Sequence, residues 1–328
     1  MRRPRVGFLG VGWIGRHRME AMLATGAVEA AAIVDPSPDC AAEAARLAPR
    51  AALPGSYEEM LALGLDGVAI ATPSALHAEQ SAAALEAGAA VFCQKPLGRT
   101  AAEVREVVEA ARKADRLLAV DLSYRFTEGV QRIRELIREG ELGRVFAADL
   151  VFHNAYGPDK GWFYDPARSG GGCVIDLGVH LVDLALWALD FPAVAGVSAR
   201  LLAGGAALAE PAGQVEDYAV ATLDLAGGAV IRLACSWRLQ AGCDARIAAE
   251  FHGTAGGAAL RNLGGSFYDF AAERYRGTQC ETLASPPDAW GGRAAADWAR
   301  RLAGGERFAG EAERLVDVAD VLDRIYGR

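Results

Sequence analysis

A glycine-rich stretch near the N-terminus constrains the fold of this chain more than any other feature. Residues 6–9 have the apolar pattern of a short buried strand, the motif Gly10-x-Gly12-x-x-Gly15 follows directly, and a helical pattern continues to about Thr25. The first glycine permits a tight turn, the second lets the backbone approach a pyrophosphate, and the third lets the helix pack against the strand. This spacing, in this context, predicts the first strand-turn-helix unit of a dinucleotide-binding fold.

An acidic residue at the end of the next strand pattern supports that prediction. Residues 28–34 are followed by Asp35, which lies twenty residues after Gly15, the spacing at which a carboxylate meets the adenosine ribose. A carboxylate accepts hydrogen bonds from a ribose diol and repels a 2′-phosphate, and no arginine occurs in residues 36–38. The sequence therefore favours NAD over NADP. By itself, Asp35 could also be a turn residue before a proline.

Strand and helix patterns alternate up to residue 121. After a short helix at 57–63 they are strand 66–71, a helix that follows the turn at 72–74, carries His77 and continues to about residue 87, strand 89–93, helix 100–114 and strand 117–121. This alternation predicts a doubly wound parallel sheet, which binds its ligands beyond the C-terminal ends of the strands. Gly10, Asp35, Thr72 and Lys95 all lie at such strand ends, so we expect them at one edge of the sheet.

Lys95 is unusual in this chain because only three of its 34 lysine and arginine residues are lysine. An amine loses its proton when it is desolvated or placed near another cation, whereas a guanidinium keeps its proton. A lysine between a strand end and Pro96 therefore suggests a chemical requirement. The alternative is a strand-end lysine in solvent.

Composition limits the classes of function. With 328 residues and about 150 residues per domain, we expect two domains. A net charge of −8 without a clustered basic face argues against binding nucleic acid or a membrane surface, so small-molecule partners are expected. The six cysteines lie far apart without a C-x-x-C motif, which indicates reduced thiols in a cytoplasmic protein and no metal site. No apolar run approaches about 18 residues, so no membrane span is expected.

A polar stripe on an apolar helix pattern marks the second half of the chain. Residues 170–172 are all glycine, and residues 174–187 then form a buried helix pattern. Asp176, His180 and Asp183 are spaced by four and three residues, so they share one helix face. A lone histidine there would be structural, but two carboxylates around it favour a function, because buried charges are costly unless paired or used.

Strand patterns without intervening helices follow, at residues 218–225, 229–237 and 245–252. They predict an α/β chain with a doubly wound domain over residues 1–122 and an α+β domain with a large, mostly antiparallel sheet over residues 123–328. A sheet with helices on one face leaves its other face apolar, and a second subunit would bury that face. We therefore expect a homodimer or homotetramer formed through the C-terminal sheet.

Several motifs together resemble one known family. They are the glycine-rich turn, Ala71-Thr72-Pro73-Ser74 with His77, Gln94-Lys95-Pro96, Tyr124-Arg125-Phe126 and Gly172-x-x-x-Asp176-x-x-x-His180. Their order is similar to that in the family of glucose–fructose oxidoreductase, inositol dehydrogenase and MocA, and the resemblance spans nearly the whole chain. It implies a nicotinamide-dependent oxidoreductase with a Rossmann domain and an open-faced sheet domain, acting on sugars, cyclitols and their derivatives.

The resemblance also implies residue roles. The residues implied to bind the cofactor are Gly10, Gly12, Trp13, Ile14, Gly15, Asp35, Thr72, Pro73, Ser74, His77, Gln94, Lys95 and Arg125. The family motif usually reads Glu-Lys-Pro, and Gln94 removes that charge while keeping an amide that can contact the nicotinamide ribose. By similarity to the inositol dehydrogenase branch, Lys95, Asp176 and His180 are the catalytic residues. His180 would exchange the hydroxyl proton, Lys95 would stabilise the developing alkoxide, and Asp176 would orient the substrate.

The segment from residue 154 to residue 168 is expected to set substrate specificity. Asn154, Tyr156, Trp162 and Arg168 could bind hydroxyls or stack on a sugar, and each is equally open to a structural role. The segment has no basic cluster for a substrate pyrophosphate, which favours free polyols or sugars. The leading interpretation is an NAD-dependent dehydrogenase or reductase. The alternatives are a redox-neutral glycosidase or epimerase that recycles NAD, a sugar-nucleotide ketoreductase, and a non-catalytic dinucleotide sensor.

Overall fold

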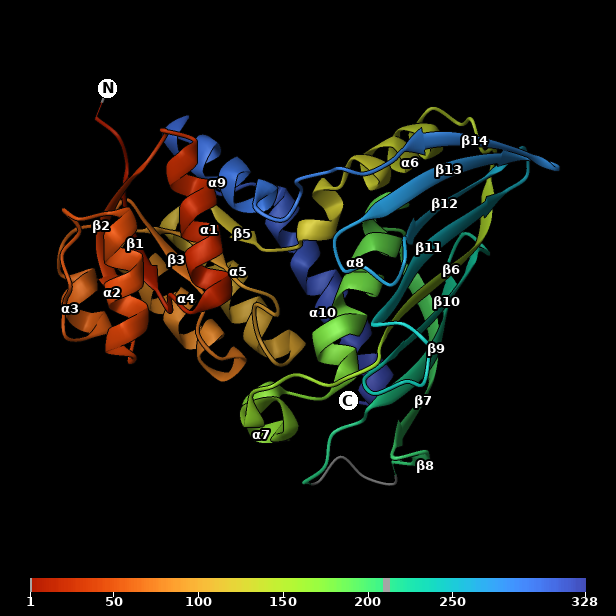
Figure 1. Cartoon of the computed structure of the whole chain (residues 1–328), viewed down its shortest axis with the longest axis horizontal. Coiled ribbons are helices and arrows are strands. Elements are labelled where there is room, and N and C mark those ends of the chain that lie inside the picture. Colours follow the sequence, from red (N-terminus) through yellow and green to blue (C-terminus); the bar gives the residue numbers. More distant parts are fainter. Residues whose placement is uncertain (1, 209–212) are drawn as a thin grey trace. The chain divides into compact units, whose positions relative to one another are not determined.

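The computed structural model describes residues 2–208 and 213–328, which form two compact units (Figure 1). The first unit contains residues 1–121 and 292–316, and the second contains residues 122–291 and 317–328. The chain first passes between units one residue before the boundary expected from sequence, and residues 292–316 return to the first unit. The return has a packing reason, because the fully buried Trp298 lies against Phe92 with 5.9 Å between ring centroids.

The first unit is built on a five-stranded parallel sheet with the order β2-β1-β3-β4-β5. Its strands are β1 (Arg5–Leu9), β2 (Glu29–Val34), β3 (Gly67–Ile70), β4 (Ala90–Cys93) and β5 (Leu118–Val120). Its helices are α1 (Trp13–Ala24), α2 (Pro38–Leu47), α3 (Tyr57–Leu61), η1 (Ser74–Leu76), α4 (His77–Glu86), α5 (Ala101–Ala114), α9 (Arg293–Ala303) and η5 (Gly310–Glu313). The parallel sheet predicted from the alternating pattern is confirmed.

The strand order reverses between β1 and β3, because β2 lies on one side of β1 and every later strand lies on the other. Ligands of doubly wound sheets bind at such a switch point, outside the C-terminal strand ends. Gly10 follows β1 and Thr72 follows β3 by one further residue, so both lie at this point. The sheet topology thus positions the glycine-rich turn where a ligand is expected.

The second unit contains a nine-stranded sheet with the order β14-β13-β12-β11-β6-β10-β9-β7-β8. Its strands are β6 (Val145–Asn154), β7 (Val194–Ala203), β8 (Ala206–Ala207), β9 (Tyr218–Leu225), β10 (Val230–Ser236), β11 (Ala245–Gly253), β12 (Gly257–Asn262), β13 (Phe270–Arg276) and β14 (Gln279–Ala284). Adjacent strands are antiparallel except β6 and β10. The predicted large, mostly antiparallel sheet is therefore confirmed.

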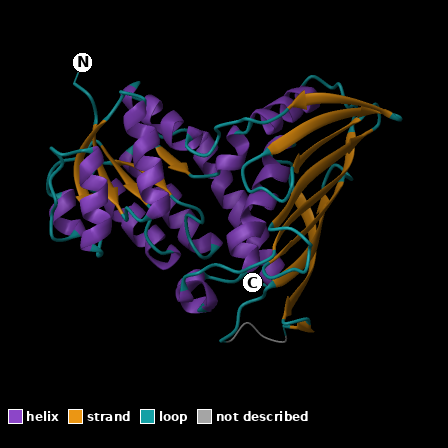
Figure 2. Cartoon of the chain, viewed as in Figure 1, coloured by secondary structure: helices purple, strands orange, loops and turns teal. Residues whose placement is uncertain are grey.

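Helices of the second unit cover one face of this sheet (Figure 2). The helices of this unit are η2 (Ser123–Phe126), α6 (Glu128–Arg138), η3 (Gly161–Tyr164), α7 (Pro166–Ser169), η4 (Val174–Gly178), α8 (Val179–Ala188) and α10 (Arg314–Tyr326). Of these, α6 packs on β12 to β14 and α8 on β6, β10 and β11, whereas α7 lies away from the sheet (Figure 1). The opposite face carries a row of small apolar side chains on paired strands, namely Val220, Ala234, Val151 and Ala248. Val220 is 40% exposed, so this face is open to solvent in the single chain.

The helical segment from residue 166 to residue 188 is apolar and long enough to cross a membrane. In the structure, however, 89% of its most apolar window is buried inside the protein. The buried side chains of η4 and α8 belong to the core that lies under the nine-stranded sheet. The apolar character of this segment is therefore explained by its position in the core of the second unit.

Candidate functional site

Two glycines of the N-terminal turn are required by close backbone packing. Gly10 has a φ of 78°, and a Cβ at this position would lie 2.7 Å from the carbonyl carbon of Ala71. A Cβ on Gly15 would lie 2.0 Å from the carbonyl oxygen of Gly10. No side chain fits at such distances, so these two glycines allow β1, β3 and α1 to meet at the switch point.

Gly12 lies in a different environment, because a Cβ at this position would meet no protein atom within 4 Å. It is also the N-cap of α1, the residue directly before the helix, and α1 has no side-chain cap and no acidic residue in its first turn. By contrast, α2 and α5 are capped by Ser37 and Thr100, whose side chains accept hydrogen bonds from backbone N–H groups in the first turn. The start of α1 thus combines open space with uncompensated N–H groups, and these features fit a pyrophosphate.

Asp35 is fixed at the end of β2 by two backbone donors. The N–H of Val11 donates to Oδ2 at 2.7 Å, and the N–H of Ser37 donates to Oδ1 at 2.8 Å. The carboxylate therefore supports the glycine-rich turn as well as the start of α2. Each carboxylate oxygen can accept a second hydrogen bond, so the position remains suited to a ribose diol.

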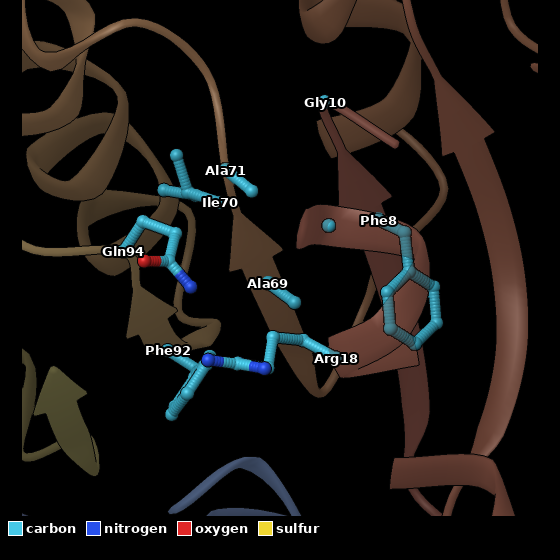
Figure 3. Close-up of a pocket in the computed structure, with 9 residues that line it drawn as sticks. Phe8, Gly10, Arg18, Ala69, Ile70, Ala71, Phe92 and Gln94 are labelled. Atoms are coloured by element: carbon cyan, nitrogen blue, oxygen red, sulfur yellow. The ribbon is translucent and has the colours of Figure 1, made fainter. Parts of the chain in front are cut away.

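Gln94, at the end of β4, belongs to a buried polar group under the same turn. Its amide donates to Oδ2 of Asp121, and the same oxygen accepts a hydrogen bond from Nε of Arg18 at 2.5 Å. Figure 3 shows Gln94 and Arg18 at a small cavity of about 10 Å³, which also borders Gly10 and Ala69. The amide that the sequence assigned to the nicotinamide ribose is thus engaged with Asp121, and its contact with the cofactor stays a prediction.

His77 connects two of the loops at the strand ends. Its Nδ1 lies 2.6 Å from the carbonyl oxygen of Pro96, and its Nε2 lies 2.7 Å from the carbonyl oxygen of Thr72. Burial lowers the pKa of His77, although the two carbonyls act in the opposite direction. A neutral ring has one N–H and donates to one carbonyl at a time. His77 therefore ties the segment after β3 to the segment that contains Lys95.

The remaining predicted cofactor residues of the first unit lie in the same loops. Thr72 donates its hydroxyl to Oε1 of Gln80 at 2.6 Å, Pro73 precedes η1, and Ser74 is buried within it. Trp13 begins α1 with 65% of its surface exposed, and its ring stacks on His17. Lys95 follows Gln94 and is half-buried.

Lys95 belongs to the first unit, whereas Asp176 and His180 belong to the second. Asp176 lies in η4, a wide helical turn of the π type, and His180 lies in the first turn of α8. Such wide turns occur frequently at functional sites. The indole Nε1 of Trp237, just beyond β10, donates to Oδ2 of Asp176 at 3.0 Å and fixes this carboxylate.

Aromatic residues surround His180, which is 7% exposed. The ring of Tyr124 meets the imidazole edge to face with 4.9 Å between centroids, and Tyr124 in turn contacts Trp290, also at 4.9 Å. Burial raises the pKa of Tyr124 above its ordinary value. These contacts restrict rotation of the histidine ring, which is what a proton-transfer group requires.

Asp183 forms a buried ion pair with Arg125. The guanidinium donates to both carboxylate oxygens, with Nε 2.8 Å from Oδ2, and it lies 5.7 Å from the ring centroid of Trp187. Burial raises the pKa of Asp183, and the adjacent Arg125 opposes that rise. Asp183, the third polar residue of the predicted stripe, thus links α8 to η2, which contains Arg125. The predicted role of Arg125 in cofactor binding stays a prediction.

The four residues predicted to set substrate specificity have different surroundings. Trp162 stacks on Phe163 at 3.8 Å, and Phe163 meets the edge of Trp237, the residue that binds Asp176. Tyr156 is exposed beside Phe267. The other two predicted residues are Asn154, whose Oδ1 is buried without a hydrogen-bond partner among the described residues, and Arg168, which is exposed in α7. Trp162 is therefore connected to Asp176, and Tyr156 has separate contacts.

Sequence reasoning missed Arg18, Asp121 and Trp237. Asp121 could have been found from sequence, because it is a polar residue directly after an apolar strand. Arg18 and Trp237 carry none, since their partners are 103 and 61 residues away in the chain. Within residues 2–208 and 213–328, no cluster of three or more histidine, cysteine, aspartate or glutamate side chains could hold a metal ion.

Comparison with known proteins identifies the family. Residues 4–122 match the model of an oxidoreductase family with an NAD-binding Rossmann fold, and residues 130–259 match the model of the GFO/IDH/MocA C-terminal domain. The chain belongs to this oxidoreductase family. The family's Rossmann domain binds NAD, in agreement with the open turn at Gly12 and with the acid at Asp35.

Curated relatives of this chain include inositol 2-dehydrogenase 3 of Saccharopolyspora erythraea, which is 32% identical over 189 residues that cover 57% of this chain and 54% of that protein. D-glucoside 3-dehydrogenase of Escherichia coli is 33% identical over 211 residues, which cover 61% of this chain and 60% of that protein. Levoglucosan dehydrogenase of Pseudarthrobacter phenanthrenivorans is 30% identical over 248 residues, which cover 68% of this chain and 63% of that protein. The chain thus spans less than two thirds of the length of these relatives.

Solved structures match almost the whole chain. GenD2 from gentamicin A biosynthesis, solved in complex with NAD, has a TM-score of 0.82 and 26% identity, and the match covers 100% of this chain and 96% of that chain. Levoglucosan dehydrogenase in complex with NADH has a TM-score of 0.83 and 23% identity, with 99% and 97% covered. The second likeness concerns the fold alone.

Proposed function

We propose that this chain is an NAD-dependent oxidoreductase that transfers a hydride between the nicotinamide and a secondary alcohol or ketone of a sugar, cyclitol or related polyol. The observation that carries the proposal is the turn at Gly12, which the chain leaves open and uncapped inside a matched NAD-binding domain. The nicotinamide supplies the hydride acceptor or donor when it is bound.

The roles of the chain's own residues follow from their chemistry. The Lys95 ammonium would donate a hydrogen bond to the reacting oxygen and stabilise its developing negative charge. His180, restrained by Tyr124, would take the hydroxyl proton during oxidation and return it during reduction. Asp176, fixed by the indole of Trp237, would accept hydrogen bonds from substrate hydroxyls.

The second unit also supports a polyhydroxylated substrate. The stacked rings of Trp162 and Phe163, with Trp237 edge to face against Phe163, offer apolar surface beside the carboxylate of Asp176, which suits the alternating C–H and hydroxyl groups of a sugar. The buried Oδ1 of Asn154 can accept one hydroxyl. The named relatives act on glucosides, levoglucosan and inositol, which agrees with this chemistry.

The test is a substrate panel with the purified chain. NADH formation is measured with NAD and a set of sugars, glycosides and cyclitols, and NADH oxidation is measured with the corresponding ketones. Lys95→Ala should lower kcat/KM by about 100- to 1,000-fold, while Lys113→Ala, at an exposed position in α5, should leave it unchanged. Sugar release without net NADH would indicate the redox-neutral alternative. NAD binding without turnover on the panel would contradict the proposal.

A further inference from the structure

The helical segment that carries Asp176 begins with four N–H groups that have no partner within the helix. Three of them bind Glu216, a residue 1% exposed just before β9. Gly172 donates to both carboxylate oxygens at 3.0 Å, Cys173 donates to the backbone carbonyl of Glu216 at 3.1 Å, and Val174 donates to Oε1 at 2.8 Å. Glu216 therefore satisfies three consecutive donors at the start of this segment.

The fourth donor binds a residue of the last helix. The N–H of Ile175 donates to the hydroxyl oxygen of Tyr326 in α10 at 3.2 Å. The Tyr326 hydroxyl in turn donates to Oε1 of Glu216 at 2.8 Å. The first bond within the segment then follows, from the N–H of Asp176 to the carbonyl of Gly172 at 3.1 Å. Every N–H from residue 172 to residue 176 thus has a specific partner.

The glycines before the segment are explained by the same two residues. A Cβ on Gly172 would lie 1.9 Å from the carbonyl oxygen of Glu216, and a Cβ on Gly171 would lie 2.0 Å from the hydroxyl oxygen of Tyr326. The backbone at residues 171 and 172 can approach Glu216 and Tyr326 this closely only without side chains. The glycine run therefore serves the contact with Glu216 and Tyr326.

Asp176 is consequently fixed from two directions. Glu216 and Tyr326 fix the backbone of the turns that precede it, and Trp237 fixes its carboxylate. A buried anion at a helix start also interacts favourably with the positive end of the helix dipole. The N–H of Asp176 binds the carbonyl of Gly172 and so closes the first helical turn. A shift of the helix start would therefore move Asp176 away from Trp237.

We propose that Glu216 and Tyr326 are positioning residues that set the placement of Asp176 and, through the following turn, of His180. The proposal deepens the proposed function, since it assigns a supporting structure to the same candidate catalytic helix. It predicts that a change at either residue displaces Asp176 without disturbing cofactor binding in the first unit.

The first experiment reads the position of Asp176 without using activity. The chain has six tryptophans, so its proton–nitrogen NMR correlation spectrum should show six indole N–H signals. The signal that is lost in Trp237→Phe is the one from the indole that donates to Asp176. In Glu216→Gln, the amide –NH2 would face the N–H of Gly172, so the helix start should shift and the Trp237 signal should move by more than its linewidth. Tyr326→Phe removes one hydroxyl and should move the same signal. Glu250→Gln, at an exposed position of β11, should leave it in place.

The second experiment uses kinetics on a substrate found in the panel. Both variants should lower kcat by about 10- to 100-fold, because small displacements of catalytic groups have effects of that size. The dissociation constant for NAD should stay unchanged. An inactive wild-type chain would contradict the proposed function, but the indole spectra would still test the positioning role.

One result would overturn the inference. If both variants melt at a lower temperature while the Trp237 signal and kcat stay unchanged, Glu216 and Tyr326 support the fold and do not position Asp176. If Glu216→Gln fails to fold, Tyr326→Phe decides the question by itself, since it preserves the carboxylate and its bonds to Gly172 and Val174.

Discussion

At the residue scale, Gln94 shows how one side chain can change the charge of a site and keep its geometry. Arg18 and Asp121 form a buried pair under the glycine-rich turn, and Gln94 adds a neutral donor to the same carboxylate oxygen. A glutamate at this position, as in the family motif, would place two carboxylates beside one guanidinium. The neutral amide keeps this buried group balanced, because Asp121 already supplies the negative charge.

We predict that Gln94→Glu destabilises the chain and that the loss grows with pH. Burial and the Asp121 carboxylate would raise the pKa of the new carboxyl above its unfolded value. Below about pH 4 the new carboxyl is neutral in both the folded and the unfolded chain, and the variant keeps its full free energy of unfolding. This free energy falls as pH rises through the folded pKa, because the buried group then ionises. The free energy of unfolding should fall by about 2 kcal/mol near pH 7. Denaturant unfolding at acid and neutral pH measures this change, and a loss independent of pH would contradict the prediction.

The control for that experiment is Gln279→Glu, at an exposed position in β14. It introduces the same side chain without a buried neighbour, so its effect should stay within about 0.5 kcal/mol at every pH. An equal loss in both variants would indicate a general effect of added negative charge on a chain that already carries −8.

Asp35 gives a second prediction at this scale. Asp35→Asn keeps an acceptor for the N–H of Val11 but removes the negative charge that repels a 2′-phosphate. Affinity for NAD should fall by about 10-fold, and the ratio of NADP to NAD affinity should rise. Calorimetric titration with both cofactors measures the change. An unchanged ratio would show that Asp35 does not select the cofactor.

At the scale of elements, two glycines of the glycine-rich turn have different roles, one in packing and one in ligand binding. The carbonyl oxygen of Gly10 leaves no room for a side chain at Gly15. A Cβ added at Gly12, by contrast, would have no protein atom within 4 Å. Both glycines belong to one sequence motif, yet the constraint on Gly15 comes from within the chain. The constraint on Gly12 is expected to come from the ligand.

We predict opposite results for two alanine variants of this turn. Gly12→Ala should keep the melting temperature of the cofactor-free chain and weaken NAD binding by at least about 10-fold. Gly15→Ala should lower the free energy of unfolding by about 3 kcal/mol, because the turn and α1 must separate to admit the methyl group. Melting curves with and without NAD distinguish these outcomes. A destabilised Gly12→Ala chain with normal NAD binding would contradict the assignment.

At the scale of the whole molecule, the open face of the nine-stranded sheet is expected to be an oligomer interface. Val220, Ala234, Val151 and Ala248 form an apolar row across four paired strands on this face. Beside the row, Arg232 pairs with Asp149 at 2.5 Å. An apolar row with polar neighbours is typical of a surface that a second copy covers.

Light scattering coupled to size-exclusion chromatography tests this expectation. The wild-type chain should elute as a dimer or tetramer, and Val220→Arg should shift it toward the monomer, because it places charge in the apolar row. Leu53→Arg, at a position 57% exposed in the first unit, is the matched control and should leave the mass unchanged. A monomeric wild-type chain would contradict the expectation.

The sequence by itself determined the family and the main secondary-structure elements, but several elements were missed. The parallel sheet follows from alternating patterns, and the strand at Tyr218–Leu225 matches its predicted bounds because the hairpin glycines at residues 227 and 228 mark its end. Helix α2 was missed, although Ser37 and Pro38 carry the signal of a helix start. The strands β7 and β12 to β14 were also missed, since small residues and glycines weaken their alternation.

Only the tertiary structure decided which distant residues support the candidate site. Trp237 reaches Asp176 across 61 positions, Tyr326 reaches Ile175 across 151, and Gln94 turns to Asp121. Local patterns report periodicity and turn chemistry, which depend on neighbours in sequence. Hydrogen bonds between distant side chains depend on how strands and helices pack, and no local pattern encodes that packing. The sequence therefore indicated the chemistry, and the fold supplied the contacts that position it.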